Sequence, residues 1–277
     1  MEQLDRCLSP ASFAAPEVLV VDSAWLEHAP FAFWIIERHR PDVLVELGTH
    51  TGYSYLCFCQ QVRKSNLATR CFAVDTWVGD AHAGFYGEDI FSNLSRYHDP
   101  RYGQFSRLVR SSFEQAVGQF ADASIDLLHL DGRHFYDDVR QDFEMWRPKL
   151  SARAVVIFHD TQVRERDFGV YRFWDEISSG LPHFEFKHCF GLGVLGVGPA
   201  AAELPLFSAA SDAAAAQAIA EAYARLGATF SLAAQVTQLR AEVARLRRPH
   251  AAPAGAVSYQ FNWPPPAGVN PPRGQEP

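Results

Sequence analysis

Acids and histidines follow two apolar runs in the middle of the chain. "HLDGRHFYDD" contains Asp131 and His134, and "IFHDT" contains His159 and Asp160. Carboxylate oxygens suit a hard cation such as Mg²⁺, whereas added imidazoles fit Mn²⁺, Fe²⁺ or Zn²⁺ better. Histidine is also a suitable general base near neutral pH, because its unperturbed pKa is about 6.5. We therefore expect a site for acid–base or metal-assisted chemistry here.

Each histidine also has a structural alternative. His134 could cap the helix that follows it, and His159 could orient Asp160 without touching a ligand. His129 lies inside an apolar run, so we expect it to pack rather than to react.

A glycine turn follows an earlier apolar run, in "VLVELGTHTGYSYL". Gly48 and Gly52 stand where the chain should pass from a strand into a helix, and such turns hold nucleotides. Glu46 occupies the position of the first glycine of a dinucleotide fingerprint. A carboxylate there would repel a pyrophosphate but would suit a cationic ligand. S-adenosylmethionine has a sulfonium, an ammonium and a ribose, and it has no phosphate.

A second acid supports a nucleoside site. Asp75 ends the next apolar run, about 25 residues after the glycine turn, and an acid there can bind both ribose hydroxyls. With Asp75, an empty strand–helix turn becomes the weaker interpretation of Gly48 and Gly52.

The stretch "VLVELGTHTGYSYL" closely resembles the first motif of class I S-adenosylmethionine-dependent methyltransferases, and the likeness extends over about 41–198. The nearest groups are small-molecule O-methyltransferases of the catechol and caffeoyl-CoA type and sugar-tailoring methyltransferases. "VRSSFEQA" is loosely similar to the family segment near the adenine. The resemblance implies a cofactor site made of Glu46, Gly48, Thr49, Gly52, Tyr53, Asp75, Thr76, Trp77, Ser111 and Ser112.

The resemblance also implies a metal and a base. In the metal-dependent members, an Asp after one strand and an Asp-Asn pair after the next hold a divalent cation. Asp131 matches the first position, whereas His159 and Asp160 replace the pair, so Asp131, His159 and Asp160 are the expected ligands of Mg²⁺ or another divalent cation. His134 stands at the offset of the family's catalytic lysine. Asp131 and His134 are therefore the expected catalytic residues.

Short apolar runs alternate with helix-like segments over the first two hundred residues. This alternation predicts an α/β fold with a doubly wound, mostly parallel, seven-stranded sheet, similar to a Rossmann fold. The expected strands lie at 42–47, 70–75, 105–111, 124–131, 153–160, 184–190 and 192–198. Glu46, Asp75, Asp131, His159 and Asp160 all follow or end such runs, where ligands gather in these sheets. A helix is expected over 22–39, with Asp22 or Ser23 as its cap.

Two segments should choose the acceptor. Residues 75–103 form a long stretch without a convincing strand, in which Asp80, His82, Tyr86 and Asp89 could contact a polar acceptor; a helix that only packs on the sheet is the alternative. Arg164 and Arg166 either bind an anionic part of the substrate or are solvated. The phrases "AVDTWVGDAHAGFYG" and "HDTQVRERDFGVYRFW" resemble a bacterial methyltransferase subgroup of polysaccharide and natural-product gene clusters, which implies a small-molecule or glycan acceptor.

Composition restricts the partners. Hydrophobic residues make up 48% and charged residues 21% of the chain, and the net charge of -7 argues against binding nucleic acid. Apolar runs are too short for membrane insertion, and no secretory signal is expected. The 5 cysteines form no C-x-x-C pair, so a reducing cytoplasm is the expected location.

The chain changes character after Pro205. We expect a methyltransferase domain over 1–205, an alanine-rich helix with a short coiled coil over 206–248, and a Pro-rich disordered tail over 249–277. The apolar seam of the coiled coil suits either packing on the chain's own domain or a homo-oligomer, and its members are Leu232, Val236, Leu239, Val243 and Leu246.

These observations favour methyl transfer from S-adenosylmethionine to a hydroxyl of a small, sugar-containing acceptor, with divalent-metal assistance as an option. Two alternatives stay open. One is an iron- and 2-oxoglutarate-dependent oxygenase similar to cephalosporin hydroxylase. The other is a non-catalytic protein that binds S-adenosylmethionine and partners a glycosyltransferase.

Overall fold

A computed structural model describes residues 2–20, 22–80 and 82–247 of the chain. The predicted disordered tail, 249–277, lies outside these residues. The chain divides into two units, Met1–Gln238 and Leu239–Pro277. Within the described ranges, no helix combines the length and apolar character that a membrane span needs.

The first unit is built on a seven-stranded sheet with the order β5-β2-β1-β6-β7-β9-β8. The first five strands in this order are parallel, and β9 runs antiparallel to both of its neighbours. The predicted mostly parallel, seven-stranded α/β sheet is therefore confirmed. Its strands are β1 (Val43–Leu47), β2 (Arg70–Asp75), β5 (Ser106–Arg110), β6 (Ile125–Leu130), β7 (Leu150–His159), β8 (His183–Phe186) and β9 (Leu192–Gly196).

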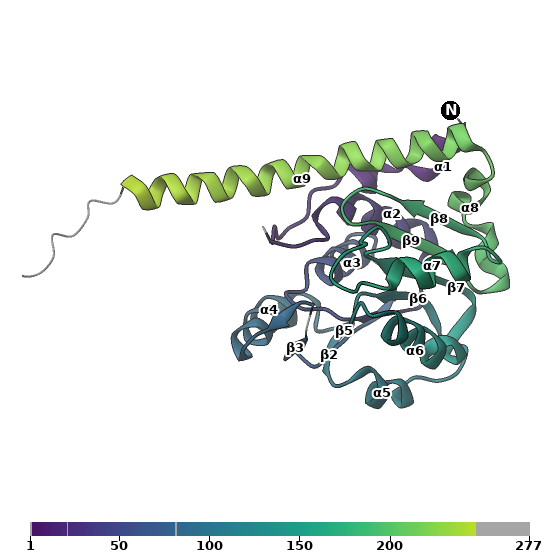
Figure 1. Ribbon diagram of the computed structural model, residues 1–277, viewed down its shortest axis with the longest axis horizontal. Coiled ribbons are helices and arrows are strands. Elements are labelled where there is room, and N and C mark those ends of the chain that lie inside the picture. Colours follow the sequence, from purple (N-terminus) through teal and green to yellow (C-terminus); the bar gives the residue numbers. More distant parts are fainter. Residues whose placement is uncertain (1, 21, 81, 248–277) are drawn as a thin grey trace, which may run out of the picture. The chain divides into compact units, whose positions relative to one another are not determined.

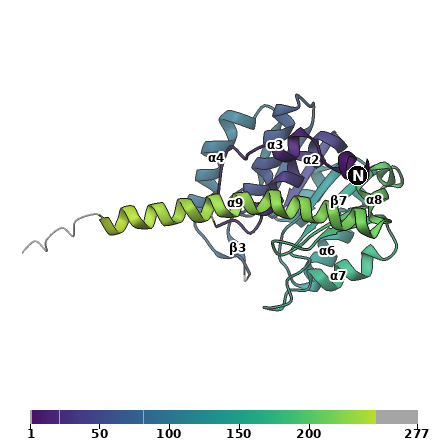
Figure 2. The same cartoon turned by 90° about the horizontal axis from the view of Figure 1, so that it is seen from above.

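Helices cover both faces of this sheet (Figures 1 and 2). In Figure 2, α2, α3 and α4 lie on one side and α6 and α7 on the other. The longer helices are α2 (Ala29–His39), α3 (Tyr53–Lys64), α4 (Glu88–Tyr102), α6 (Tyr136–Trp146), α7 (Val170–Ser178) and α9 (Ala213–Arg247). The short ones are α1 (Glu2–Cys7), α5 (Phe113–Ala116), α8 (Pro205–Ala210) and the 3₁₀ turns Pro10–Phe13, Leu26–His28, Val117–Gln119, Arg147–Lys149 and Pro199–Glu203.

Alternation along the strands produces two hydrophobic cores. On β7, Val155 and Ile157 join the core under α2 and α3, whereas Val156 and Phe158 join the core under α6 and α7. Successive strand residues point to opposite faces, so a continuous apolar run fits a sheet that is covered on both sides.

The helix expected over 22–39 begins later than predicted. α2 starts at Ala29 with Pro30 in its first turn, and a separate 3₁₀ turn covers Leu26–His28. Proline lacks the N–H that a helix interior requires, so it fits the first turn of α2 and disfavours a helix that starts at Asp22 or Ser23.

The long segment after β2 is more ordered than the sequence suggested. It contains α4 and a small antiparallel hairpin of β3 (Gly79–Asp80) and β4 (Gly84–Phe85). Leu94 and Tyr102 on α4 are buried in the core. The expectation of a strandless segment was thus wrong. The helix of the alternative interpretation is present as α4, with the hairpin ahead of it.

Candidate functional site

Two neighbouring cavities lie at the carboxyl ends of the parallel strands. The first cavity, of about 340 Å³, borders the ends of β1, β2 and β6. The second cavity, of about 260 Å³, borders the ends of β1, β6 and β7. Both are lined by Gly48, His50, Ala83, Asp131 and His134.

The glycine turn after β1 forms part of both cavities. Gly48 has φ +86°, and a Cβ added to it would meet the backbone oxygen of Asp131 at 2.1 Å. Its N–H donates to Val74 O at 3.0 Å, while the Asp131 N–H donates to Leu47 O at 2.8 Å. This turn therefore needs glycine both for its backbone conformation and for the close approach of the β6 end.

Asp75 lines the first cavity and also holds the glycine turn. Its Oδ2 accepts the backbone N–H groups of Thr49 and His50, both at 2.8 Å. Its Oδ1 accepts the Trp77 N–H at 2.7 Å. Because a carboxylate offers about four acceptor positions, a remaining position on Oδ1 is available to a ligand hydroxyl.

Glu46 does not line either cavity. Its side chain is fully buried, and its Oε2 accepts hydrogen bonds from Ser54 Oγ at 2.7 Å and His129 Nδ1 at 2.8 Å. Burial raises the pKa of Glu46, although the hydrogen bonds from His129 and Ser54 oppose this shift. The structure thus places Glu46 behind the cavity wall, where it joins β1, α3 and β6. A partner for this acid 83 positions away could not be read from the glycine turn alone.

The other predicted cofactor residues divide between the cavities and their support. Thr76 and Ser112 line the first cavity, and Thr49 and Tyr53 line the second. Three others line neither cavity. Gly52 packs on Leu94, Trp77 is buried with its Nε1 donating to His50 O, and Ser111 donates to Ser112 O.

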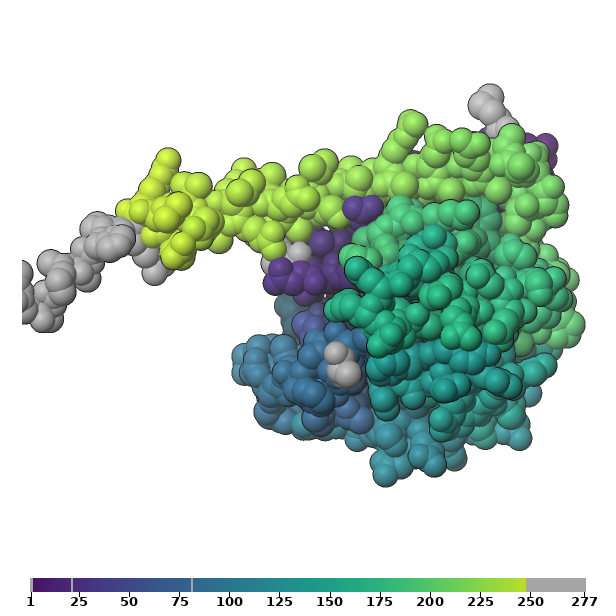
Figure 3. All heavy atoms as spheres, viewed as in Figure 1, coloured from purple at the N-terminus to yellow at the C-terminus, as the bar shows by residue number. Residues whose placement is uncertain are grey.

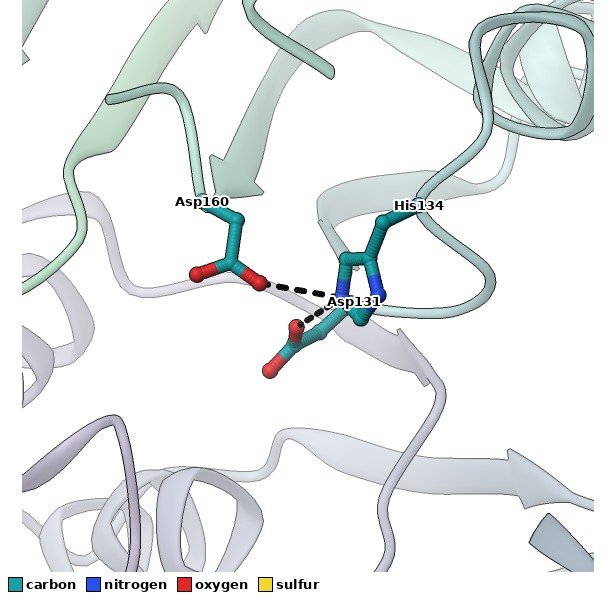
Figure 4. Close-up of side chains that lie close together, drawn as sticks. All are labelled: Asp131, His134 and Asp160. Atoms are coloured by element: carbon teal, nitrogen blue, oxygen red, sulfur yellow. Dashed lines mark ion pairs between the residues drawn. The ribbon is translucent and has the colours of Figure 1, made fainter. Parts of the chain in front are cut away.

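Asp131, His134, His159 and Asp160 converge as expected from the neighbouring strands β6 and β7. His134 Nε2 lies 3.0 Å from Asp160 Oδ2 and 3.5 Å from Asp131 Oδ1, as Figure 4 shows. His159 Nδ1 lies 3.2 Å from Asp131 Oδ1 and 3.4 Å from Asp160 Oδ1. Asp160 has φ 62°, a left-handed conformation that Asp tolerates better than most residues. Each imidazole therefore lies between the same two carboxylates.

The opposite charges of the histidines and acids in this cluster stabilise one another. Burial alone would lower the pKa of His134, but hydrogen bonds and charge from Asp131 and Asp160 raise that pKa to about 9. His159 shows the same balance, and its pKa is also raised. Burial opposes ionisation of Asp131, yet the neighbouring histidines hold its pKa well below the usual range. At neutral pH, His134 is thus an imidazolium between two acceptors.

Three of these residues could bind a divalent cation. Asp131, His134 and Asp160 each offer a ligand atom, and these atoms lie within 4.8 Å of one another. Two carboxylates and one imidazole form a mixed oxygen and nitrogen donor set that fits several divalent metals. The sequence had placed His159 in this set instead of His134. His159 contacts both acids, which also suits an orienting role.

Aromatic side chains that the sequence reasoning missed complete the second cavity. Phe168 stacks on His134 with ring centroids 4.5 Å apart and an interplanar angle of 9°. Trp25 lines the same cavity and packs against His129 and His159. His50, with φ 48°, lines both cavities. The position of His50 between Gly48 and Gly52 could have indicated this role, whereas the sequence around Trp25 and Phe168 contains no such indication.

The segments expected to choose the acceptor meet beside these cavities. In Figure 3 the blue surface adjoins the teal surface. His82 lies against Phe135 and Phe168, with ring centroids 4.3 and 4.5 Å away. Asp80 and Tyr86 line the first cavity and His82 lines the second. Asp89 is exposed in the first turn of α4 and lines neither.

A family comparison covers the segment that carries this geometry. Residues 45–161 match the family model described as "Methyltransferase domain". The matched segment contains the glycine turn, Asp75 and all four residues of the Asp–His cluster.

A relative with high identity matches a larger share of the chain. The protein y4gI of Sinorhizobium fredii, described as uncharacterized, is 51% identical over 199 residues. The match covers 72% of this chain and 22% of that relative, so the chain spans 22% of the length of the curated relative that it matches.

Solved structures resemble this chain more distantly. Cofactor-bound Rv0187 from MTB is 14% identical with a TM-score of 0.49, over 71% of this chain and 90% of that one. The O-methyltransferase TomG from Streptomyces achromogenes, involved in tomaymycin synthesis and solved with S-adenosylmethionine, is 14% identical with a TM-score of 0.47, over 72% and 99%. At scores below 0.5, these similarities carry no argument about function.

Proposed function

We propose that this chain transfers a methyl group from S-adenosylmethionine to a hydroxyl of a small, sugar-containing acceptor. The observation that supports this most is the shared wall of the two cavities, formed by Gly48, His50, Ala83, Asp131 and His134. Two substrates in adjacent cavities meet at this wall, and bringing them together in the right geometry supplies much of the rate of such a reaction.

The first cavity fits the donor. Asp75, Thr76 and Ser112 would hold the nucleoside, with the free position on Asp75 directed to the ribose hydroxyls. Its lining also includes Asp80 and Asp131, an acidic surrounding that suits a sulfonium and an ammonium better than a pyrophosphate. When bound, S-adenosylmethionine supplies an electrophilic methyl group.

The second cavity fits the acceptor. Trp25, Tyr53 and Phe168 give it aromatic surfaces, and Asp22 and Glu165 give it hydrogen-bond acceptors. Rings together with carboxylates suit a ligand that has apolar faces and many hydroxyls. The likeness of residues 73–87 and 159–174 to a subgroup of polysaccharide and natural-product clusters supports the same acceptor class.

His134 is the residue that we assign to the acceptor's proton. Its Nε2 lies at the shared wall and is held by Asp160 and Asp131. Because its pKa is about 9, the imidazole accepts the acceptor's proton only after it has lost its own. The two carboxylates orient the ring and stabilise the imidazolium that forms after transfer.

A divalent cation would bind at Asp131, His134 and Asp160, and it would supply a Lewis acid near the acceptor hydroxyl. Binding would displace the proton of His134, because a ligating imidazole must be neutral. The roles of His134 as base and as metal ligand are therefore alternatives, and with the cation bound the Lewis acid would take the place of the base.

Calorimetry tests the donor. S-adenosylmethionine and its demethylated product should bind, and NAD should not. Asp75→Ala should weaken the affinity for S-adenosylmethionine by about tenfold or more, because three backbone N–H groups and the ribose lose their acceptor. Binding of NAD in place of S-adenosylmethionine would exclude methyl transfer.

Chelation and one substitution test the metal. Asp160→Ala should abolish any stimulation by added Mg²⁺ or Mn²⁺ and should lower turnover about 100-fold, while affinity for S-adenosylmethionine is retained. Turnover that is unchanged by both EDTA and Asp160→Ala would remove the metal from the proposal.

An iron-dependent oxygenase is the second candidate, and His159 is the observation that favours it. Non-haem iron oxygenases commonly use two histidines and one carboxylate, and His159 Nδ1 lies within 3.4 Å of both acids. Consumption of 2-oxoglutarate with Fe²⁺, in the absence of S-adenosylmethionine, would decide for this candidate.

A further inference from the structure

A third cavity, of about 690 Å³, lies beside the second and is rich in arginine. We call it the arginine cavity; Arg164, Arg166 and Arg172 line it together with Tyr136, Phe168 and Tyr171. These residues come from the segment between β7 and α7 and from the starts of α6 and α7.

Aromatic rings hold the three guanidinium groups. Arg164 lies over Tyr171 at 4.1 Å, Arg172 over Tyr136 at 4.7 Å and Arg166 over Phe168 at 5.1 Å, measured from the guanidinium carbon to the ring centroid. Among the residues that the structure describes, no carboxylate forms an ion pair with any of the three. Stacking fixes the plane of a guanidinium, and its free edge N–H groups can bind phosphate oxygens in pairs. Part of the Arg164 edge is occupied, because its Nη1 donates to Thr161 O at 2.8 Å.

The backbone adds a further donor at the same place. α7 begins at Val170, directly after Gly169, which also lines the cavity. The first N–H groups of a helix have no partner within it and favour anions. The Gly169 N–H donates to His134 O and the Arg172 N–H to Gly169 O, so among the described lining residues of this helix start the Tyr171 N–H is the donor left for a ligand beside the arginines.

The arginine cavity and the second cavity share two lining residues. Arg166 and Phe168 line both. The Phe168 ring contacts the His134 imidazole and the Arg166 guanidinium, and the Gly169 N–H donates to His134 O at 2.7 Å. His134 and Arg166 thus both contact the Phe168 ring, so a ligand that lies along this ring can reach both.

We propose that the arginine cavity binds a phosphate or diphosphate group of the acceptor, so that the acceptor is a phosphorylated sugar. That the bound molecule is a methyl acceptor rests on the proposed methyl transfer, whereas the anion site itself does not depend on it. Asp137 and Asp167 also line the cavity and reduce the attraction for anions. They are outnumbered by the arginines, and binding should weaken as salt is added.

Direct binding tests the site without any turnover. Calorimetry would use pyrophosphate, inorganic phosphate and UDP-glucose on the full chain, and on a variant with Arg164→Gln, Arg166→Gln and Arg172→Gln. We expect pyrophosphate to bind the native chain and the triple variant to lose affinity about tenfold or more. Arg101→Gln is the matched control, because Arg101 also stacks on a tyrosine, Tyr97 at 3.9 Å, and lines none of the three cavities.

The outcomes are separable. Equal pyrophosphate affinity in the native chain and the triple variant, or no pyrophosphate binding by the native chain, would overturn the site. The single variant Arg172→Gln serves if the triple variant is not folded by circular dichroism. Binding of UDP-glucose through the arginines indicates a nucleotide-linked sugar, and binding of pyrophosphate without UDP-glucose indicates a smaller phosphorylated sugar. Arginine-dependent pyrophosphate binding without any binding of S-adenosylmethionine would reject methyl transfer and keep the anion site.

Discussion

His134 shows how position changes the chemistry of one side chain. An isolated histidine is mostly neutral at pH 7, yet here two carboxylates within 3.5 Å of Nε2 raise the pKa of the imidazole. The sequence predicted that Asp131, His134, His159 and Asp160 would meet, because strand ends of a parallel sheet lie side by side. The distances and the resulting charge could not be predicted, because they depend on how β6 and β7 are aligned.

This charge predicts a pH-dependent stability. The pKa of His134 is raised in the folded state, to about 9, so its stabilising effect is fully present below about pH 6.5 and is lost as pH rises through 9. His134→Gln should therefore lower the melting temperature more at pH 6 than at pH 10. Asp131 stays ionised throughout this range, because its pKa is held low. Thermal unfolding in EDTA measures the difference, and an effect of the same size at both pH values would contradict the assignment.

At the scale of elements, the glycine turn was readable and the start of α2 was not. Gly48 and Gly52 after an apolar run predicted a strand and a helix, and both form where expected. Asp22 and Ser23 looked like a helix cap, but Pro30 moves the helix start to Ala29. Glu46 also followed a family pattern, yet its contact with His129 depends on the β1–β6 register, which pairs these two residues.

The turn gives a prediction with an internal control. Gly48→Ala places a Cβ against Asp131 O in addition to the strain of a positive φ, so it should destabilise the fold by about 2 kcal/mol or more and weaken binding of S-adenosylmethionine. Gly84→Ala has φ +80° but open space around the added Cβ, so it should cost about 1 kcal/mol. Chemical denaturation compares the two, and equal losses would mean that the contact with Asp131 is unimportant.

At the scale of the whole molecule, the alternation of apolar runs and helices is enough to predict the type of sheet, whereas the function of the complete chain cannot be predicted from this pattern. The alternating pattern predicted the seven strands, and the two cores confirm that both faces are covered. The match spans only 22% of y4gI, so partners and pathway remain proposals.

The C-terminal seam belongs to this scale too. Ile219, Tyr223 and Ala234 of α9 are buried, whereas Leu232, Val236 and Leu239 are 60%, 44% and 65% exposed.

The exposed seam predicts self-association. Changing Leu232, Val236 and Leu239 together to Gln should reduce the molecular mass in light scattering to that of a monomer, because apolar residues at this spacing pair helices. Leu181→Gln is the control, since Leu181 is 37% exposed and lies outside α9. A monomeric native chain would reject the homo-oligomer.

The shared wall of the first and second cavities has a consequence for inhibition. Within the described part of the chain, Gly48, His50, Ala83, Asp131 and His134 line both spaces, so one covalently joined molecule can occupy both. Joining two ligands turns the second binding step into an intramolecular one at high effective concentration. A nucleoside linked to a sugar phosphate would thus be a bisubstrate inhibitor whose two halves report separately on the donor and the acceptor.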